Sequence, residues 1–311
     1  QLVGPQSKIP NIGDTIKLTI TKQPIIITRI DENRIKAYFN ICQHRGGPIV
    51  DENNCYQQFQ CQYHGWIYTN EGKLKNARGF DKDELKKSDF NLKEINVSVW
   101  NGLMFINFDK RCNSLESIYE KLEKRIDKRN FSSYQFYKRD SYNISCNWKI
   151  YMDNYLEGLH IPIVHPELNK TINYKSYKTE IHDQFSLQWC SIDPQLNPYK
   201  NDSSEDLIAY YVTIFPNVIL NIAPGRLQTN IVEPIDEKNC SVHFDYYFEQ
   251  IDEKQIQKDL DFSDIIQRED IEICESVQAS YEAKGFKNGI ISKKYESGIL
   301  HFHSRLKEIL L

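Results

Sequence analysis

The sequence has 311 residues and a formal net charge of −4, with 40% hydrophobic and 26% charged residues. This composition is typical of a folded globular protein with one large or two ordinary domains. The acidic balance argues against nucleic acid as the main partner, because nucleic-acid-binding proteins usually carry a basic surplus. No apolar run is long enough for a membrane span, so no membrane association is expected.

The first ten residues, QLVGPQSKIP, lack the basic and apolar stretches of a signal peptide. The eight cysteines are too sparse for a disulfide scaffold. We therefore expect a cytoplasmic protein. In a reducing compartment, Cys and His residues that cluster in the sequence indicate metal binding.

Residues 15–110 predict an all-β module. Segments 15–20, 24–30 and 35–41 are rich in β-branched and aromatic residues and are separated by Asp, Asn and Pro. Residues 96–108 have the pattern of a hairpin that turns at Asn101 and Gly102.

The pattern changes near residue 115, where apolar residues acquire helical spacing: Leu115, Ile118, Leu122 and Ile126. We therefore predict a first domain over 1–113 and a second over 114–311. In the second domain, β-rich segments lie between residues 209 and 251. A long helix is predicted from Asp261 to about Lys284, and a last helix over 297–310. The fold class is α+β, with an all-β domain followed by an antiparallel sheet that helices cover.

Two Cys–His pairs lie in turn-rich segments: Cys42 and His44 in CQHRGG, Cys61 and His64 in CQYHGW. Buried residues without a metal would not explain two such pairs. A structural zinc site is a second interpretation, but zinc modules usually pair Cys with Cys and His with His. A Rieske [2Fe–2S] cluster requires one Cys and one His from each of two loops, since two thiolates hold one iron and two imidazoles the other. The longer segments CQHRGGPIV and CQYHGWIY resemble the two cluster loops of the Rieske family.

A second constellation follows in NWKIYMDNYLEGLHIPIVH, residues 147–165. His160 and His165 lie on either side of Pro162, which interrupts a regular helix. Alone, they could be surface or capping residues. A mononuclear Fe(II) oxygenase site, however, requires two imidazoles and one carboxylate, and Glu269 and Asp270 in QREDIEICESVQ can supply the carboxylate.

On these segments the chain resembles the catalytic alpha subunits of Rieske non-heme iron oxygenases, in the aromatic-ring-hydroxylating dioxygenase superfamily. The resemblance implies His160, His165 and Asp270 as ligands of a mononuclear Fe(II), with Glu269 as the fallback if the helix register is off by one. It also implies a homotrimer in which Glu157 connects a cluster histidine of the neighbouring subunit to the iron site, although Asp is usual at this position. Glu157 and Asn154 are the candidate catalytic residues.

An oxygenase of this kind uses dioxygen and electrons from a separate reductase or ferredoxin, because the sequence has no G-x-G-x-x-G nucleotide-binding motif. The 19 tyrosines and 15 phenylalanines could form an aromatic cage around a quaternary ammonium, or could simply fill the core. The segments ESGILHFHSRL and ICESVQ resemble family members that act on choline, betaine or carnitine-like amines. We expect hydroxylation or N-demethylation of a small organic substrate. The alternatives are ring hydroxylation or O-demethylation of an aromatic compound, and a non-enzymatic iron–sulfur or zinc protein.

Overall fold

The computed structural model describes residues 1–311 except 82, 113, 127–128 and 193–206. The chain divides into two compact units, Gln1–Lys121 and Leu122–Leu311. The boundary expected at 113/114 falls on residue 113, which lies outside the described residues. Within the described ranges, no helix has both the length and the apolar character needed to cross a membrane.

The first unit is built on two antiparallel sheets. The seven-stranded sheet has the order β1 (Leu2–Pro5), β10 (Leu103–Asn107), β9 (Glu94–Trp100), β4 (Ile35–Phe39), β3 (Gln23–Arg29), β2 (Asp14–Ile20), β5 (Asn54–Cys55). The three-stranded sheet consists of β6 (Gln58–Gln60), β7 (Ile67–Thr69) and β8 (Leu74–Asn76). Two short 3₁₀ helices, η1 (Gln6–Lys8) and η2 (Lys87–Phe90), complete it. The predicted all-β character is confirmed.

The hairpin predicted at Asn101 and Gly102 is also confirmed. Trp100 pairs with Leu103 across β9 and β10, so the two turn residues are the only ones between the strands. Both have positive φ, 48° and 79°, which a tight two-residue turn requires.

Helix α1 (Leu115–Arg125) follows, as the apolar spacing predicts. Its Tyr119 stacks on Trp100 with ring centroids 4.1 Å apart.

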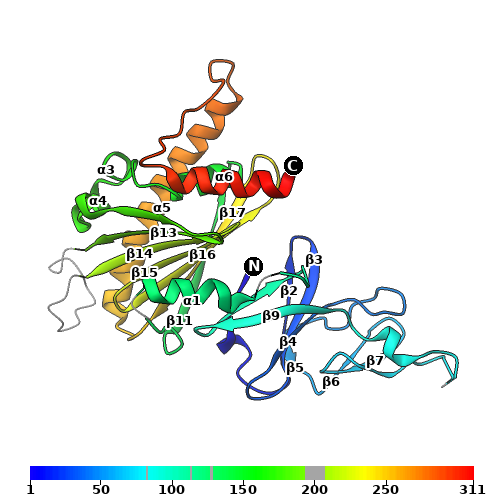
Figure 1. The fold of residues 1–311 in the computed structure, drawn as a ribbon. Coiled ribbons are helices and arrows are strands. Elements are labelled where there is room, and N and C mark those ends of the chain that lie inside the picture. Colours follow the sequence, from blue (N-terminus) through cyan, green and yellow to red (C-terminus); the bar gives the residue numbers. More distant parts are fainter. Residues whose placement is uncertain (82, 113, 127–128, 193–206) are drawn as a thin grey trace. The chain divides into compact units, whose positions relative to one another are not determined.

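The second unit contains a seven-stranded antiparallel sheet that helices accompany (Figure 1). Its strand order is β11 (Gln135–Ile144), β17 (Cys240–Phe248), β16 (Arg226–Pro234), β15 (Val218–Ala223), β14 (Ile208–Ile214), β13 (Phe185–Ser191), β12 (Lys178–Ile181). The helices are α2 (Trp148–Tyr155), α3 (Ile161–Val164), α4 (Pro166–Thr171), α5 (Glu253–Glu282) and α6 (Ser297–Leu310), with a 3₁₀ turn η3 (Tyr174–Ser176). The predicted α+β class is confirmed.

The long helix α5 begins at Glu253, earlier than the predicted start at Asp261. Asp252 caps this end, because its carboxylate accepts the backbone N–H groups of Lys254 and Gln255. The extra turns also bury Ile256 against the core. Helix α5 crosses the sheet (Figure 1). Helix α2 packs against both α5 and β16. Residues near 155 and residues near 265 thereby become neighbours.

Candidate metal centres and substrate pocket

The two Cys–His loops of the first unit have the same backbone design. The N–H of Cys42 donates to the carbonyl of Gly47 at 2.8 Å, and the N–H of Cys61 donates to that of Trp66 at 2.9 Å. Gly46 and Gly65 occupy matching turn positions with φ of +75° and +71°. Each loop therefore folds back on its cysteine and presents the histidine that follows.

The loops face each other. A Cβ placed on Gly47 would lie 3.2 Å from Cys61 Sγ, so the first loop closes on the second only without a side chain there. The ring centroids of His44 and His64 are 4.6 Å apart, and the Nδ1 atoms of both are buried with no hydrogen-bond partner in the part of the chain that the structure describes. Both thiols are buried as well. Two buried thiols and two unpartnered imidazole nitrogens are the donor set that fits a Rieske cluster.

Tyr68 is a polar neighbour of this donor set that the sequence did not reveal. Its hydroxyl lies 3.3 Å from Cys42 Sγ and accepts the backbone N–H of Gln43 at 3.1 Å. Since the oxygen accepts from Gln43, its proton is available to the sulfur. Burial, together with the hydrogen bond to Cys42, raises the pKa of Tyr68, so the phenol stays protonated.

In the second unit, α2 and the loop after it position the first of the two site histidines. Asn147 caps α2 by accepting the N–H of Lys149. After the helix, the loop lies directly on the ring of Tyr177, since a Cβ on Gly158 would come within 2.7 Å of that ring. This close approach constrains the backbone next to His160, which follows Gly158 by two residues.

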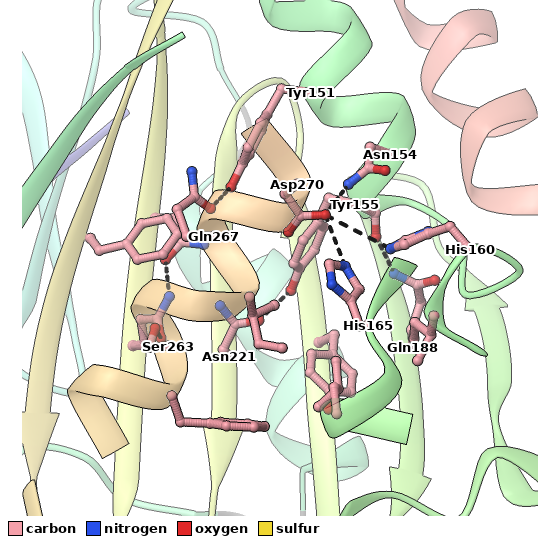
Figure 2. Close-up of a pocket in the computed structure, with 18 of the residues that line it drawn as sticks. Tyr151, Asn154, Tyr155, His160, His165, Gln188, Asn221, Ser263, Gln267 and Asp270 are labelled. Carbon is pink, nitrogen blue, oxygen red and sulfur yellow. Dashed lines mark hydrogen bonds and ion pairs between the residues drawn. The ribbon is translucent and has the colours of Figure 1, made fainter. Parts of the chain in front are cut away.

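His160, His165 and Asp270 come together although one of them is more than a hundred residues away in the sequence (Figure 2). Their ligand atoms all lie within 4.8 Å of one another. Asp270 Oδ1 is 3.0 Å from His165 Nε2 and 4.0 Å from His160 Nε2. Two imidazoles and one carboxylate converging from one side are the donor set of a mononuclear iron site with open positions.

Two further carboxylates hold the outer nitrogens of the imidazoles. Glu157 Oε1 lies 2.6 Å from His160 Nδ1, and Glu269 Oε2 lies 2.7 Å from His165 Nδ1. Burial alone would lower the pKa of His165, but its hydrogen bonds and charge interactions with Asp270 and Glu269 outweigh burial and raise it. Such carboxylate–imidazole pairs fix the ring orientation, with Nε2 directed inward.

Asn154 occupies the last turn of α2 and contacts the third member of the group. Its Nδ2 donates to Asp270 Oδ1 at 2.6 Å (Figure 2). Asn154 therefore touches the candidate metal ligand and orients that carboxylate.

A pocket of about 170 Å³ opens beside these residues. Its lining includes four tyrosines: Tyr151, Tyr155, Tyr177 and Tyr211. The hydroxyl of Tyr155 donates to Asn221 and that of Tyr177 donates to Gln188, which fixes the positions of these rings. Burial raises the pKa of all four phenols well above the usual value. The aromatic wall is therefore electrically neutral.

Polar residues on the pocket face of α5 were missed in the sequence. Asp259, Ser263 and Gln267 are buried, and the last two line the pocket. Asp259 forms an ion pair with Arg226 at 2.8 Å, and Arg226 also lines the pocket. In the sequence, a polar residue occurs at each helical turn before Asp270, and this spacing could have indicated the polar stripe. Such a pattern is more typical of a solvent-exposed helix face.

Two family models match this chain. Residues 131–311 match the family "Ring hydroxylating alpha subunit (catalytic domain)", and residues 1–96 match "Rieske [2Fe-2S] domain". The chain belongs to the ring-hydroxylating alpha-subunit family. This family membership makes the protein a Rieske non-heme iron oxygenase, an oxidoreductase whose cofactors are a [2Fe–2S] cluster and a mononuclear iron. The match to a catalytic domain rules against the alternative of a non-enzymatic iron–sulfur or zinc protein.

Two curated relatives of this ring-hydroxylating alpha subunit extend the comparison. The chloroplastic choline monooxygenase of Arabidopsis thaliana is 29% identical over 98% of this chain and 76% of the relative. The carnitine monooxygenase oxygenase subunit of Escherichia coli is 27% identical over 99% of this chain and 86% of the relative. Among solved structures, a quaternary ammonium Rieske monooxygenase has a TM-score of 0.85 at 22% identity, covering 99% of this chain and 87% of that chain. At that identity the structural likeness supports the fold.

Proposed function

We propose that this oxygenase oxidises an N-methylated quaternary ammonium compound. The observation that carries the proposal is the tyrosine-lined pocket beside His160, His165 and Asp270. Neutral aromatic faces attract a quaternary ammonium through cation–π interactions, and the cation loses no hydrogen bonds on burial because it has no N–H group. The names of the choline and carnitine monooxygenase relatives agree with this chemistry.

We further propose which residues hold the cofactors. Cys42, His44, Cys61 and His64 would hold the cluster, in a functional domain over 1–113. The buried thiols and the unpartnered Nδ1 atoms of the two histidines support this assignment. The mononuclear iron would be held in the domain over 114–311.

His160, His165 and Asp270 are the proposed ligands of that iron. Once bound, it would supply the redox-active centre at which dioxygen is reduced. The protein's own contribution is positional. Glu269 and Glu157 hold the imidazoles, Asn154 orients the Asp270 carboxylate, and the tyrosines place an N-methyl group next to the open positions.

The proposed reaction requires electrons as well as dioxygen. Family members of this kind use substrate, dioxygen and a reductase partner. We propose that a separate reductase or ferredoxin of the cytoplasm serves this chain. All eight cysteines are unpaired, which is consistent with a reducing compartment.

We propose a homotrimer, in which each cluster serves the iron site of the next subunit. Such a heterologous interface closes by rotation. Apolar side chains support the idea, because Leu159 and Ile163, 41% and 83% exposed, flank His160. Tyr63 and Phe80, beside the cluster histidines, are also exposed at 55% and 44%. Exposed apolar groups around two sites suit contact with a second copy of the chain.

Glu157 is the proposed connection between the two sites, since it already holds His160 from the side away from Asp270. Glu157→Gln keeps an amide oxygen that can accept from His160 Nδ1, so this variant should retain both cofactors and the trimer, yet slow electron transfer to the iron by orders of magnitude. Single-turnover oxidation of the reduced cluster, measured beside the mass of the assembly, checks this. Full activity in a monomeric protein would contradict the proposal.

Product analysis tests the proposed reaction. The reconstituted protein, with a surrogate reductase, is offered N-methylated quaternary amines and, separately, aromatic acids and aromatic hydrocarbons. We expect oxygenated or demethylated products only from the amines. Turnover of the aromatic compounds alone would overturn the proposal.

A further inference from the structure

One face of α5 carries polar residues where a helix usually buries apolar ones. Asp259, Ser263, Gln267 and Asp270 are spaced by four, four and three residues, which places them on one stripe. Three of the six buried residues of α5 are in this stripe. A buried polar stripe is costly unless each group has a partner or meets a ligand, so each member needs an explanation.

Gln267 is the member whose partners are incomplete. Its side chain is buried, with 2% exposed, and it lines the pocket. The Tyr151 hydroxyl donates to its Oε1 at 2.7 Å, which fixes the orientation of the amide (Figure 2). Its buried Nε2 has no hydrogen-bond partner among the described residues. The structure thus holds a pre-oriented N–H donor at the pocket.

Three other side-chain amides of the pocket lining donate to the protein. Asn154 Nδ2 donates to Asp270, Gln188 Nε2 donates to the carbonyl of Tyr155, and Gln228 Nε2 donates to Asn230. Gln267 differs from these three in having a buried donor with no hydrogen-bond partner among the described residues. An unmatched buried donor favours a ligand that carries an acceptor oxygen.

The position of Gln267 indicates which part of the ligand it reaches. It precedes Asp270 by three residues, which is ~4.5 Å along the helix axis. An acceptor that it contacts must therefore lie close to the reacting methyl group, as the hydroxyl of choline does, rather than at the end of a long chain.

The charged residues beside the pocket and the volume of the pocket both indicate that the acceptor group of the ligand is uncharged. Arg226 is the cationic side chain of the lining, and its ion pair with buried Asp259 at 2.8 Å already balances its charge. A substrate carboxylate beside this pair would add an uncompensated charge in a buried site. The cavity of about 170 Å³ is close to the ~150 Å³ that encloses one benzene molecule. A small ammonium alcohol fits this space better than a longer carboxylated amine.

We propose that Gln267 determines substrate specificity by donating a hydrogen bond to the hydroxyl of a small quaternary ammonium alcohol. Tyr151 acts as a positioning residue that holds the Gln267 amide. This inference rests on the proposed function, which supplies the quaternary ammonium.

The experiment compares equilibrium binding of four probes to the cofactor-loaded protein by calorimetry: choline, ethyltrimethylammonium, glycine betaine and tetramethylammonium. Choline and ethyltrimethylammonium differ in the hydroxyl, so their affinity ratio isolates the proposed hydrogen bond. Wild type should bind choline roughly tenfold more tightly than either ethyltrimethylammonium or betaine, as one buried hydrogen bond allows. Gln267→Met should abolish the preference over ethyltrimethylammonium. Gln257→Met, an exposed position on the same helix, should keep it.

Tyr151→Phe provides a second variant if Gln267→Met does not fold, and it should weaken the same preference. Equal binding of choline and ethyltrimethylammonium by wild type would overturn the inference. So would tighter binding of betaine than of choline, or an unchanged preference in Gln267→Met. These outcomes leave the proposed function standing. If none of the four ammonium probes binds, the proposed function itself fails.

Discussion

Glu269 accepts a hydrogen bond from His165, with Oε2 2.7 Å from Nδ1, while the adjacent Asp270 faces Nε2 of the same ring. Two consecutive carboxylates thus hold opposite nitrogens of one imidazole. If Asp270 is the metal ligand, Glu269 is the residue that fixes the ligand ring, and the two should respond differently to substitution.

Glu269→Ala should weaken iron binding about 10- to 100-fold, the usual effect of losing the partner of a metal-bound histidine. Asp270→Ala should remove the mononuclear iron altogether while the cluster colour remains. Iron content after dialysis against a graded chelator measures both. Glu272→Ala, exposed on the same helix, is the matched control and should keep its iron. Retention of iron by Asp270→Ala with complete loss in Glu269→Ala would reverse the assignment.

Tyr68→Phe should make the cluster harder to reduce. The variant removes the hydroxyl that lies 3.3 Å from Cys42 Sγ, and hydrogen bonds to cluster sulfurs stabilise the more negative, reduced state. A redox titration followed by visible absorbance should show a more negative reduction potential with an unchanged spectrum type. A potential equal to or above that of wild type would show that the hydroxyl does not donate to the sulfur.

Substitutions at the adjacent residues Gly46 and Gly47 distinguish a steric clash from backbone strain in the first cluster loop. Gly47→Ala would place a methyl 2.9 Å from Tyr63 Cβ and 3.2 Å from Cys61 Sγ, so cluster occupancy should fall sharply. Gly46→Ala meets no atom within 4 Å but needs a positive φ, so it should keep the cluster at a cost of about 1 kcal/mol. Cluster absorbance per protein and thermal unfolding check the pair. The reverse order of occupancy would contradict the loop geometry.

His303 and Asp153 form a pH-dependent contact outside the iron site, at 2.9 and 3.0 Å. The hydrogen bond to Asp153 raises the pKa of His303, against burial and the charges of Lys307 and Lys149. A raised pKa contributes stability that is fully present below the ordinary His value of about 6.5 and is lost as pH rises through the folded-state value.

His303→Gln should therefore lower Tm relative to wild type at about pH 6 and much less at about pH 9. The effect should stay below about 1 kcal/mol because the pair is partly exposed to solvent. Asp153→Asn should give the same pattern. A Tm difference between His303→Gln and wild type that does not change with pH would show that the pair carries no charge-dependent stability.

Local sequence patterns predicted much of this arrangement. The Cys–His spacing of the first loops and the Pro162 break between His160 and His165 are local features. The β9–β10 hairpin likewise follows from two turn residues. In each case nearby residues determine the geometry, so the sequence was sufficient to predict it.

Contacts between distant segments were not predictable in the same way. The bond between Tyr151 and Gln267 depends on how α2 packs on α5, and the polar stripe of α5 resembles an ordinary solvent face until its burial is known. Glu269 and Asp270 are neighbours in the sequence, and only the position of His165 distinguishes their roles. The start of α5 was misplaced because its Asp252 cap was not recognised.

The central claim is that electrons stored at the Cys42, His44, Cys61 and His64 centre are used at the His160, His165 and Asp270 centre to oxidise a quaternary ammonium compound. Single-turnover mixing of the chemically reduced protein with dioxygen, with and without choline, tests it most directly. We predict that choline accelerates cluster oxidation in wild type, with product formed in proportion, and has no effect in Asp270→Ala. Cluster oxidation at the same rate with and without choline, or a choline effect that persists in Asp270→Ala, would contradict the account.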